Sequence, residues 1–249
     1  MSKTPPTLRL DRLLGNLGYG SRKEVQALIE SGRVVLDGTV EDDPGQRVYV
    51  KANLAQRMTV AGAALDPPPG LLVLMMHKPL GVTCSHKEAG PLVYSLLPER
   101  WRRRDPAIST VGRLDKDTSG LLLLTDDGAL LHRIISPKSH VPKRYRVTLD
   151  RPLSGNEGAI LGAGTLMLDG EEKPLLPVAM QAVGPKEATV VLDEGRYHQV
   201  RRMFAALGNH VVALHRDRIG ALDLPDDMPP GQWCQLDEAG IAAIFGAPQ

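Results

Sequence analysis

The stretch GRLDKDTSGLLLLTDDG, residues 112–128, places four aspartates around an apolar run of four leucines. A carboxylate can serve as a nucleophile, an acid or a base, so each aspartate is a candidate for chemistry. Asp126 and Asp127 precede the apolar residues of a predicted helix, where carboxylates satisfy free amides and favour the helix dipole. Asp117 lies in a short polar segment and is best explained by turn formation. These assignments leave Asp115 as the aspartate without an ordinary structural task.

Asp115 stands at the mouth of a loop between two strands that must be buried. A carboxylate in such a place costs several kcal/mol unless it is paired with a cation. Cations occur in DEGRYHQVRRMF, residues 193–204, where Arg196, Arg201 and Arg202 crowd the entrance of a predicted helix. An arginine beside Asp115 would lower its pKa and keep it ionised at neutral pH. The residues alone leave a second interpretation open, in which these arginines bind phosphates or are solvated.

A third segment, PKRYRVTLD, alternates in the way of a β-strand. Tyr145, Val147 and Leu149 share one face of that strand. A tyrosine ring on this face could stack on a nucleobase, although most strand tyrosines are core residues.

Overall charge is nearly balanced, with 30 Lys+Arg against 29 Asp+Glu, so net charge gives no case for a nucleic-acid partner. The distribution is uneven. Residues 100–151 contain 12 basic and 6 acidic side chains, whereas residues 152–249 contain 7 and 13. The central excess of positive charge favours a local basic face for a polyanion, and a solvated surface is the alternative.

Cys84 and Cys234 are the two cysteines, and they are far apart in the sequence with no histidine at ligand spacing. We therefore predict neither a disulfide framework nor a metal site. The chain opens with no signal sequence and contains no apolar run of membrane-spanning length. We expect a cytoplasmic protein that does not contact membranes.

The N-terminal residues predict a compact unit of two helices and a small sheet. Leu10, Leu13, Leu14 and Leu17 fall on one helical face. Ser21 and Glu24 have the spacing of a capping box, which starts a second helix that Gly32 ends. Three short strands follow, in RVVLDGTV, QRVYV and RMTVAG. The stretch LDPPPG, residues 65–70, is a stiff linker because consecutive prolines forbid a helix.

Beyond this linker we predict strands alternating with two helices, at residues 127–135 and 200–207. The strands are expected in LLVLMMHKPLG, AISTV, LLLLT, RYRVTL and ATVVLD. Too many strands follow one another directly for a repeated βαβ unit, so the fold class is α+β. We find no internal repeat and no glycine-rich nucleotide-binding pattern.

The N-terminal unit resembles the alpha-L RNA-binding module, which is shared with a small-subunit ribosomal protein of the S-four type. The resemblance spans residues 8–65 and rests on LRLDRLL, GYGSRKEVQALIESGRVVLDG and the later strand pair. It implies that the second helix and the turn after it meet an RNA backbone, where cations give affinity with little sequence choice. The implied contact residues are Arg9, Arg12, Ser21, Arg22, Lys23 and Arg33.

Nearly the whole chain resembles the pseudouridine synthases, and within them the small-subunit rRNA branch (the RsuA type). The resemblance is carried by HKPLGVTCS, GRLDKDTSGLLLLTDDG, SPKSHVPKRYRVTL, EGRYHQVRRMFAALGNHVVALHRDRIG and PPGQWCQL. It implies an alpha-L domain at 8–65, a linker at 66–70 and a catalytic domain at 71–249. The catalytic domain should hold a mixed, mostly antiparallel sheet flanked by helices.

The same resemblance implies the roles of site residues. Asp115 would be the nucleophile, Tyr145 would pack on a flipped uracil, and Arg201 would pair with Asp115. The branch often has lysine at the position of Arg201, and the change keeps the charge. Further residues would shape the loop or bind substrate, namely Arg113, Thr118, Ser119, Gly120, Lys143, Arg196, His198 and Gln199.

The implied reaction is isomerisation of a uridine in ribosomal RNA to pseudouridine, most naturally in 16S RNA, by a monomer that needs no cofactor or metal. The target base must leave its stack to reach the carboxylate. Asp115 could attack the sugar carbon, add to the uracil ring or abstract a sugar proton.

Three alternatives stay open. The first is modification of 23S RNA, and the second is a non-catalytic RNA-binding or ribosome-assembly protein. The third is a hydrolase using Asp115 with His77, His132 or His198.

Overall fold

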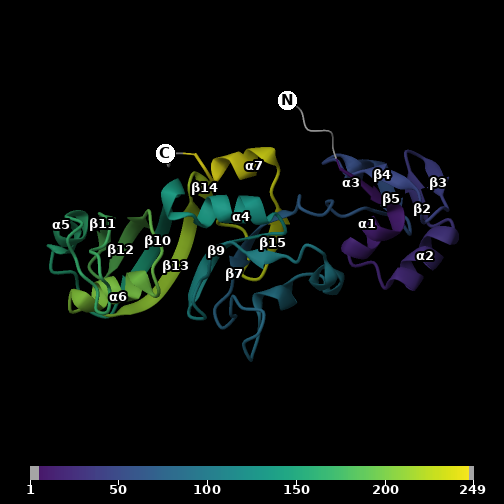
Figure 1. The fold of residues 1–249 in the computed structure, drawn as a ribbon. Helices are drawn as coiled ribbons and strands as arrows, with labels where there is room; N and C mark the ends of the chain where they lie inside the picture. Colours follow the sequence, from purple (N-terminus) through teal and green to yellow (C-terminus); the bar gives the residue numbers. More distant parts are fainter. Residues whose placement is uncertain (1–5, 247–249) are drawn as a thin grey trace. The chain divides into compact units, whose positions relative to one another are not determined.

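The computed structural model describes residues 6–246, and the chain divides into two compact units (Figure 1). The first unit comprises the described part of Met1–Val73 together with Tyr94–Ser109 and Leu124–Leu130. The remaining described residues form the second unit. Residues 66–70, predicted as a linker, fall inside the first unit, and the last three residues of the predicted domain 71–249 lie outside the described range. Across residues 6–246, no helix has both the length and the apolar character needed to cross a membrane.

The first unit begins with an α-helical pair and two small sheets. The elements are β1 (Thr7–Arg9), α1 (Leu10–Asn16), α2 (Arg22–Glu30), β2 (Val34–Leu36), β3 (Thr39–Glu41), β4 (Arg47–Tyr49), α3 (Leu54–Arg57), β5 (Met58–Val60) and β6 (Ala63–Ala64). One sheet has the order β3-β2-β5-β6, and β1 pairs with β4 in the other. All these pairings are antiparallel.

The predicted local signals of this unit are confirmed. Leu10, Leu13, Leu14 and Leu17 are completely buried in one core with residues of α2 and the sheet. The α2 helix starts with a reciprocal capping box, in which Ser21 and Glu24 each accept from the other's backbone amide. Helical periodicity and capping chemistry therefore place this unit correctly from the sequence.

Tyr94–Ser109 joins the first unit although it lies far along the chain. It contains a short 3-10 helix, Glu99–Arg103. Asp66 accepts hydrogen bonds from the Trp101 indole (2.8 Å) and from Arg100. The Arg100 guanidinium also lies over the Tyr19 ring, at 4.2 Å from its centroid.

A buried ion pair joins three segments of the first unit. Arg104 donates to Asp126 (2.7 Å) and to the Pro67 carbonyl (2.8 Å), and both charged side chains have 0% exposure. Asp126 also accepts from the Leu72 amide at 2.9 Å. The predicted helix-capping role of Asp126 is therefore wrong, because its carboxylate is engaged by a buried cation. The capping role belongs to Asp127, which accepts from the amides of Ala129 and Leu130.

The second unit is built on one large sheet. Its strands are β7 (Val73–Lys78), β8 (Ser109–Thr110), β9 (Thr118–Thr125), β10 (Lys143–Leu149), β11 (Ala179–Gly184), β12 (Glu187–Leu192), β13 (Val211–Ile219), β14 (Leu222–Asp223) and β15 (Trp233–Gln235). The helices are α4 (Gly128–Ile135), whose first turn belongs to the first unit, α5 (Glu157–Gly162), α6 (Gln199–Ala206) and α7 (Glu238–Ala243), with a short 3-10 turn at Pro137–Ser139. Another 3-10 turn, Val93–Leu96, lies almost wholly in the first unit.

The order of the sheet is β11-β12-β10-β13-β9-β7-β15, with β14 on β13 and β8 on β9 (Figure 1). The β13 and β9 strands run parallel, whereas β10 is antiparallel to both β12 and β13. The predicted mixed, mostly antiparallel sheet is thus confirmed. The central strand β13 was not predicted, because its arginines and aspartate interrupt the apolar alternation.

One core cluster packs α6 against the sheet. Val200, Met203 and Phe204 of α6 are buried with Val147 and Leu149 of β10. Tyr145 packs partly against the same cluster, on the face predicted from strand alternation. This cluster thus packs α6 against β10 on the side of the sheet that carries Tyr145.

Gly120 lets β9 approach β13 closely. Its φ is +112°, and a Cβ atom built on it would lie 2.1 Å from the Arg216 carbonyl oxygen. We expect Gly120→Ala to destabilise the protein well beyond the roughly 1 kcal/mol of an average substitution, since a strand must move. Gly112→Ala is the matched control, because Gly112 also has positive φ (72°) but has nothing within 4 Å of its Cβ position. Urea unfolding should separate the two variants, and equal midpoints would contradict this packing role.

Candidate active site

A cavity of roughly 190 Å³ lies where β9 and β10 begin, β13 ends and α6 begins. The sheet topology brings these four places together. Eight of the predicted site residues line it, namely Arg113, Asp115, Thr118, Lys143, Tyr145, Arg196, His198 and Gln199. Ser119, Gly120 and Arg201 lie outside the lining.

The loop that carries Asp115 is held by its backbone. Four consecutive carbonyl oxygens, those of residues 115–118, each accept a hydrogen bond. The donors are the Thr118 amide (3.0 Å), the Gly81 amide (2.9 Å), Arg201 Nη2 (2.9 Å) and Lys78 Nζ (2.8 Å), in that order. Because the bonds reach main-chain atoms, they fix the loop and leave its side chains available.

Lys78 is the buried member of this set. Its side chain is completely buried, and Nζ donates to the carbonyls of Pro79 (3.0 Å) and Thr118. Burial lowers the pKa of its ammonium group. The ammonium group thus holds Thr118, the first residue of β9, through a hydrogen bond.

Among residues 6–246, the side chain in contact with the Asp115 carboxylate is His198, with 3.2 Å between Asp115 Oδ1 and His198 Nε2, and this contact is an ion pair only when the imidazole is protonated. The side chains are 33% and 39% exposed, so Asp115 is less buried than its sequence context predicts. His198 has φ +47° at the N-cap of α6, which turns its ring back toward the loop.

The predicted pairing of Arg201 with Asp115 does not occur in this structure. Arg201 instead donates to the carbonyls of Asp117 (2.9 Å) and Val211 (3.0 Å). Its guanidinium therefore joins the loop to the first residue of β13.

Arg216 was missed by sequence reasoning, and it lies at the side of the cavity next to Tyr145. The two residues are direct register partners on β13 and β10. Arg216 is buried, donates to the Leu121 carbonyl (2.8 Å) and approaches the Tyr145 hydroxyl at 3.4 Å. If β13 had been recognised as a strand beside β10, Arg216 would have been a candidate site residue next to Tyr145.

Two buried polar atoms of the cavity lining have no hydrogen-bond partner among the described residues. They are Arg216 Nη2 and Thr118 Oγ1. Buried donors are normally satisfied, and an unsatisfied one costs about 1–3 kcal/mol. Neither atom is open to solvent in this structure, so a polar ligand in the cavity would satisfy them only after these side chains shift.

Lys143 adds a titratable cation to the same lining. Burial, reinforced by repulsion from Arg216 and opposed by Asp193, lowers the pKa of Lys143 to about 8. Its charge is therefore present at neutral pH and is lost in mildly alkaline solution.

Ser119 contacts β13 through its side chain. Ser119 Oγ lies 2.9 Å from His215 Nδ1, and the His215 ring meets the His77 ring edge-on with centroids 5.4 Å apart. Burial and the neighbouring His77 lower the pKa of His215. Ser119 thus contacts β13 in this structure, and its substrate contact stays a prediction.

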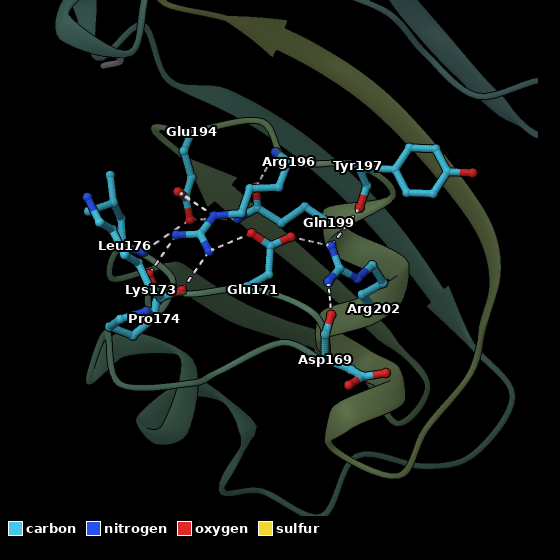
Figure 2. A network of polar contacts seen from close by, with 10 residues as sticks. All are labelled: Asp169, Glu171, Lys173, Pro174, Leu176, Glu194, Arg196, Tyr197, Gln199 and Arg202. Carbon is cyan, nitrogen blue, oxygen red and sulfur yellow. Dashed lines mark hydrogen bonds and ion pairs between the residues drawn. The ribbon is translucent and has the colours of Figure 1, made fainter.

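Figure 2 shows that Arg196 is engaged within the protein. It donates to Glu194 (3.0 Å), Glu171 (3.3 Å) and the carbonyls of Lys173 (2.7 Å) and Pro174 (2.6 Å). Its charge is offset by two carboxylates, and its substrate-binding role stays a prediction. The segment around Glu171 was unpredicted, because nothing local in the sequence ties it to α6.

Arg202 and Gln199 belong to the same network. Arg202 donates to Glu171 (2.7 Å) and to the carbonyls of Asp169 (2.5 Å) and Tyr197 (3.2 Å). Gln199 donates to Glu194 (3.0 Å) and accepts from the Arg196 amide (2.8 Å). The network therefore fixes the turn that presents His198.

The predicted RNA contacts of the first unit fall into two groups. Arg9 makes a two-point ion pair with Asp11, and the Ser21 hydroxyl caps α2, so both are already engaged. Arg12, Arg22, Lys23 and Arg33 are exposed and form no ion pair with any described residue. Arg12 and Arg22 also line a hollow of roughly 350 Å³.

No group of three or more His, Cys, Asp or Glu side chains within residues 6–246 is arranged to hold a metal ion.

Comparison with known proteins agrees with this architecture. An S4 domain model matches residues 8–52, and an RNA pseudouridylate synthase model matches residues 72–206. The chain is 36% identical over 241 residues to the ribosomal small subunit pseudouridine synthase A of Vibrio cholerae, covering 96% of this chain and 100% of that protein. It is 39% identical over 234 residues to an uncharacterised RNA pseudouridine synthase of Bacillus subtilis, with coverage of 93% and 95%. A crystal structure of a pseudouridylate synthase superposes with a TM-score of 0.67 at 33% identity, covering 95% of this chain and 99% of that one. With this site, its N-terminal S4 domain and relatives that match along almost their full length, the chain belongs to the RNA pseudouridylate synthase family.

Proposed function

We propose that this protein converts one uridine of 16S ribosomal RNA to pseudouridine, with Asp115 as the nucleophile. The observation that carries the proposal is the cavity shared by Asp115, Tyr145 and Arg216, next to a loop fixed by its own backbone. The name of the Vibrio cholerae relative supports the small subunit as the target. We further propose that the enzyme acts as a monomer in the cytoplasm, without a cofactor.

The proposed reaction conserves all atoms of the substrate. The glycosidic C–N bond breaks, the uracil turns while it remains bound, and a C–C bond forms between the same sugar carbon and a carbon of the uracil ring. The proton on that carbon leaves, and a ring nitrogen gains one. Such a rearrangement needs a nucleophile, a positioned base and exclusion of water, all of which side chains of this cavity can provide.

The cavity suggests how a flipped uracil is held. Tyr145 supplies a ring face for stacking. Arg216 Nη2 donates to a uracil carbonyl oxygen, and the Thr118 hydroxyl forms a hydrogen bond with another polar group of the base. These contacts satisfy the two buried atoms that lack partners, and they offset the few kcal/mol of flipping.

His198 orients the nucleophile in the free enzyme. Its Nε2 lies against Asp115 Oδ1, and this contact leaves the second carboxylate oxygen of Asp115 available to the substrate. Arg201 acts one step further away, as a positioning residue that holds the loop carbonyl of Asp117.

The proposal is tested by incubating the purified protein with 16S and 23S transcripts and mapping pseudouridine in each. A single modified position in 16S RNA is expected. Modification confined to 23S RNA would support the other rRNA branch, and RNA binding without modification would support an assembly protein.

The lowered pKa of Lys143 predicts how the KM for RNA changes in alkaline solution. Its charge, which we assign to a phosphate flanking the target, disappears as pH rises through about 8. We expect the KM for RNA to rise over this interval. Lys143→Arg keeps the charge to higher pH, so its KM should stay level across the same interval. Identical profiles for the two proteins would remove Lys143 from RNA binding.

Arg22 and Lys23 predict the salt dependence of RNA binding. Both are exposed near the start of α2, and each would neutralise one phosphate. Replacing both by alanine should weaken binding and reduce the slope of log K against log salt by roughly 1 to 2. Arg9→Ala is the control, because Arg9 is already paired with Asp11. Filter binding over a salt series checks this prediction, which fails if both variants keep the wild-type slope.

A further inference from the structure

Tyr197 is an exposed aromatic residue at the edge of the cavity. Its side chain is 77% exposed, although it lies between Arg196 and His198, which both line the cavity. Figure 2 shows its ring extending away from the polar network. A single exposed ring is ordinary on a protein surface, so the case for a binding role rests on where this ring lies and what it stacks on.

The ring of Tyr197 has one covered face and one open face. The covered face stacks on the His198 ring, with centroids 3.9 Å apart and an interplanar angle of 17°. His198 in turn contacts Asp115. The two rings thus form a short stack that begins beside the carboxylate and ends at the open face of Tyr197.

The backbone beneath this stack is fixed before any ligand binds. The Tyr197 carbonyl accepts from Arg202, and the neighbouring Arg196 amide donates to Gln199. Arg196 and Arg202 are both anchored on Glu171 (Figure 2). A ring on such a turn loses little conformational freedom on binding, because an aromatic side chain has only two torsions.

A base inside the cavity cannot be the partner of the open face. Tyr197 lies outside the cavity lining, and the His198 ring stands between it and Asp115. An RNA strand whose target base enters the cavity must lead its neighbouring nucleotides past the rim. Single-stranded bases stack on exposed aromatic rings, and this contact tolerates any base.

We propose that the open face of Tyr197 stacks on the nucleobase next to the target uridine. The base, Tyr197 and His198 then form a three-layer stack that ends at Asp115. This inference rests on the proposed function and adds to it a binding subsite for a flanking nucleotide.

The first test compares three substitutions of Tyr197 under single-turnover conditions. Tyr197→Ala should raise the RNA concentration at half-maximal rate by about tenfold, whereas Tyr197→Phe keeps the ring and should match the wild type. Tyr197→Leu keeps bulk without a π face and should resemble alanine. Val183→Ala, which removes an exposed side chain from β11, is the control. If Tyr197→Ala also matches the wild type, the inference is wrong.

The second test separates stacking from simple support of His198. Substrates that carry an abasic site on either side of the target uridine are assayed with wild type and with Tyr197→Ala. We expect one abasic position to cost about tenfold with the wild type and nothing further with the variant. Additive losses would overturn the inference while wild-type activity still upholds the proposed function. A wild-type protein that modifies no rRNA transcript would instead refute the proposed function.

Discussion

Asp115→Asn is expected to abolish pseudouridine formation, by roughly 10⁴-fold or more, while RNA binding stays at the wild-type level. An amide has the shape of the carboxylate but is not a nucleophile. The loop should keep its conformation, because its bonds are made by backbone carbonyls. Chemical mapping of pseudouridine and a binding assay on the same RNA measure the two properties.

Asp117→Asn is the matched control. Asp117 lies two residues away in the same loop, its side chain is exposed, and Arg201 contacts only its carbonyl oxygen. This variant should remain fully active. Product formed by Asp115→Asn at a wild-type rate would remove Asp115 from the chemistry, and equal losses in both variants would indicate a general effect of loop charge.

Asp126→Ala is expected to destabilise the protein by about 3–5 kcal/mol, because it leaves the guanidinium of Arg104 buried without a counter-charge. The Leu72 amide loses its acceptor at the same time. Asp127→Ala changes the adjacent aspartate and removes only a helix cap, which costs about 1 kcal/mol. The difference between the two unfolding midpoints in urea measures the buried pair.

A double substitution distinguishes a stranded charge from lost packing. Arg104→Met combined with Asp126→Leu replaces both charges by apolar side chains of similar size, and much of the stability should return. A double variant as unstable as Asp126→Ala alone would show that the geometry of the pair, and not its electrostatics, stabilises this region.

Local patterns predicted a large share of the fold. The leucines of α1 and the capping box of α2 depend on residues three or four positions apart, where the chain itself sets the geometry. Strand alternation likewise placed Tyr145 on the side that faces the cavity. The strand β13 was missed, since Arg216, Asp217 and Arg218 follow one another with no apolar residue between them. Asp217 pairs with Arg144 and Arg146 of β10, and no local window contains these contacts.

The sequence predicted which residues line the candidate site better than it predicted the contacts between them. Asp115, Tyr145 and His198 do line one cavity. The predicted pairing of Asp115 with Arg201 was wrong, because the Arg201 guanidinium donates to two backbone carbonyls instead. The neutralisation of Arg196 by Glu171 joins residues 25 positions apart, and only the packed loop reveals it.

The attachment of Tyr94–Ser109 to the first unit limits how this protein can be taken apart. Trp101 and Arg100 bind Asp66, and the Asp105 amide donates to the Asn16 carbonyl. If the chain were divided within residues 66–70, residues 100–105 would be separated from their contacts in the N-terminal fragment. The N-terminal segment is therefore not a self-contained domain. A graft of it onto another enzyme would also have to include Tyr94–Ser109 of this protein.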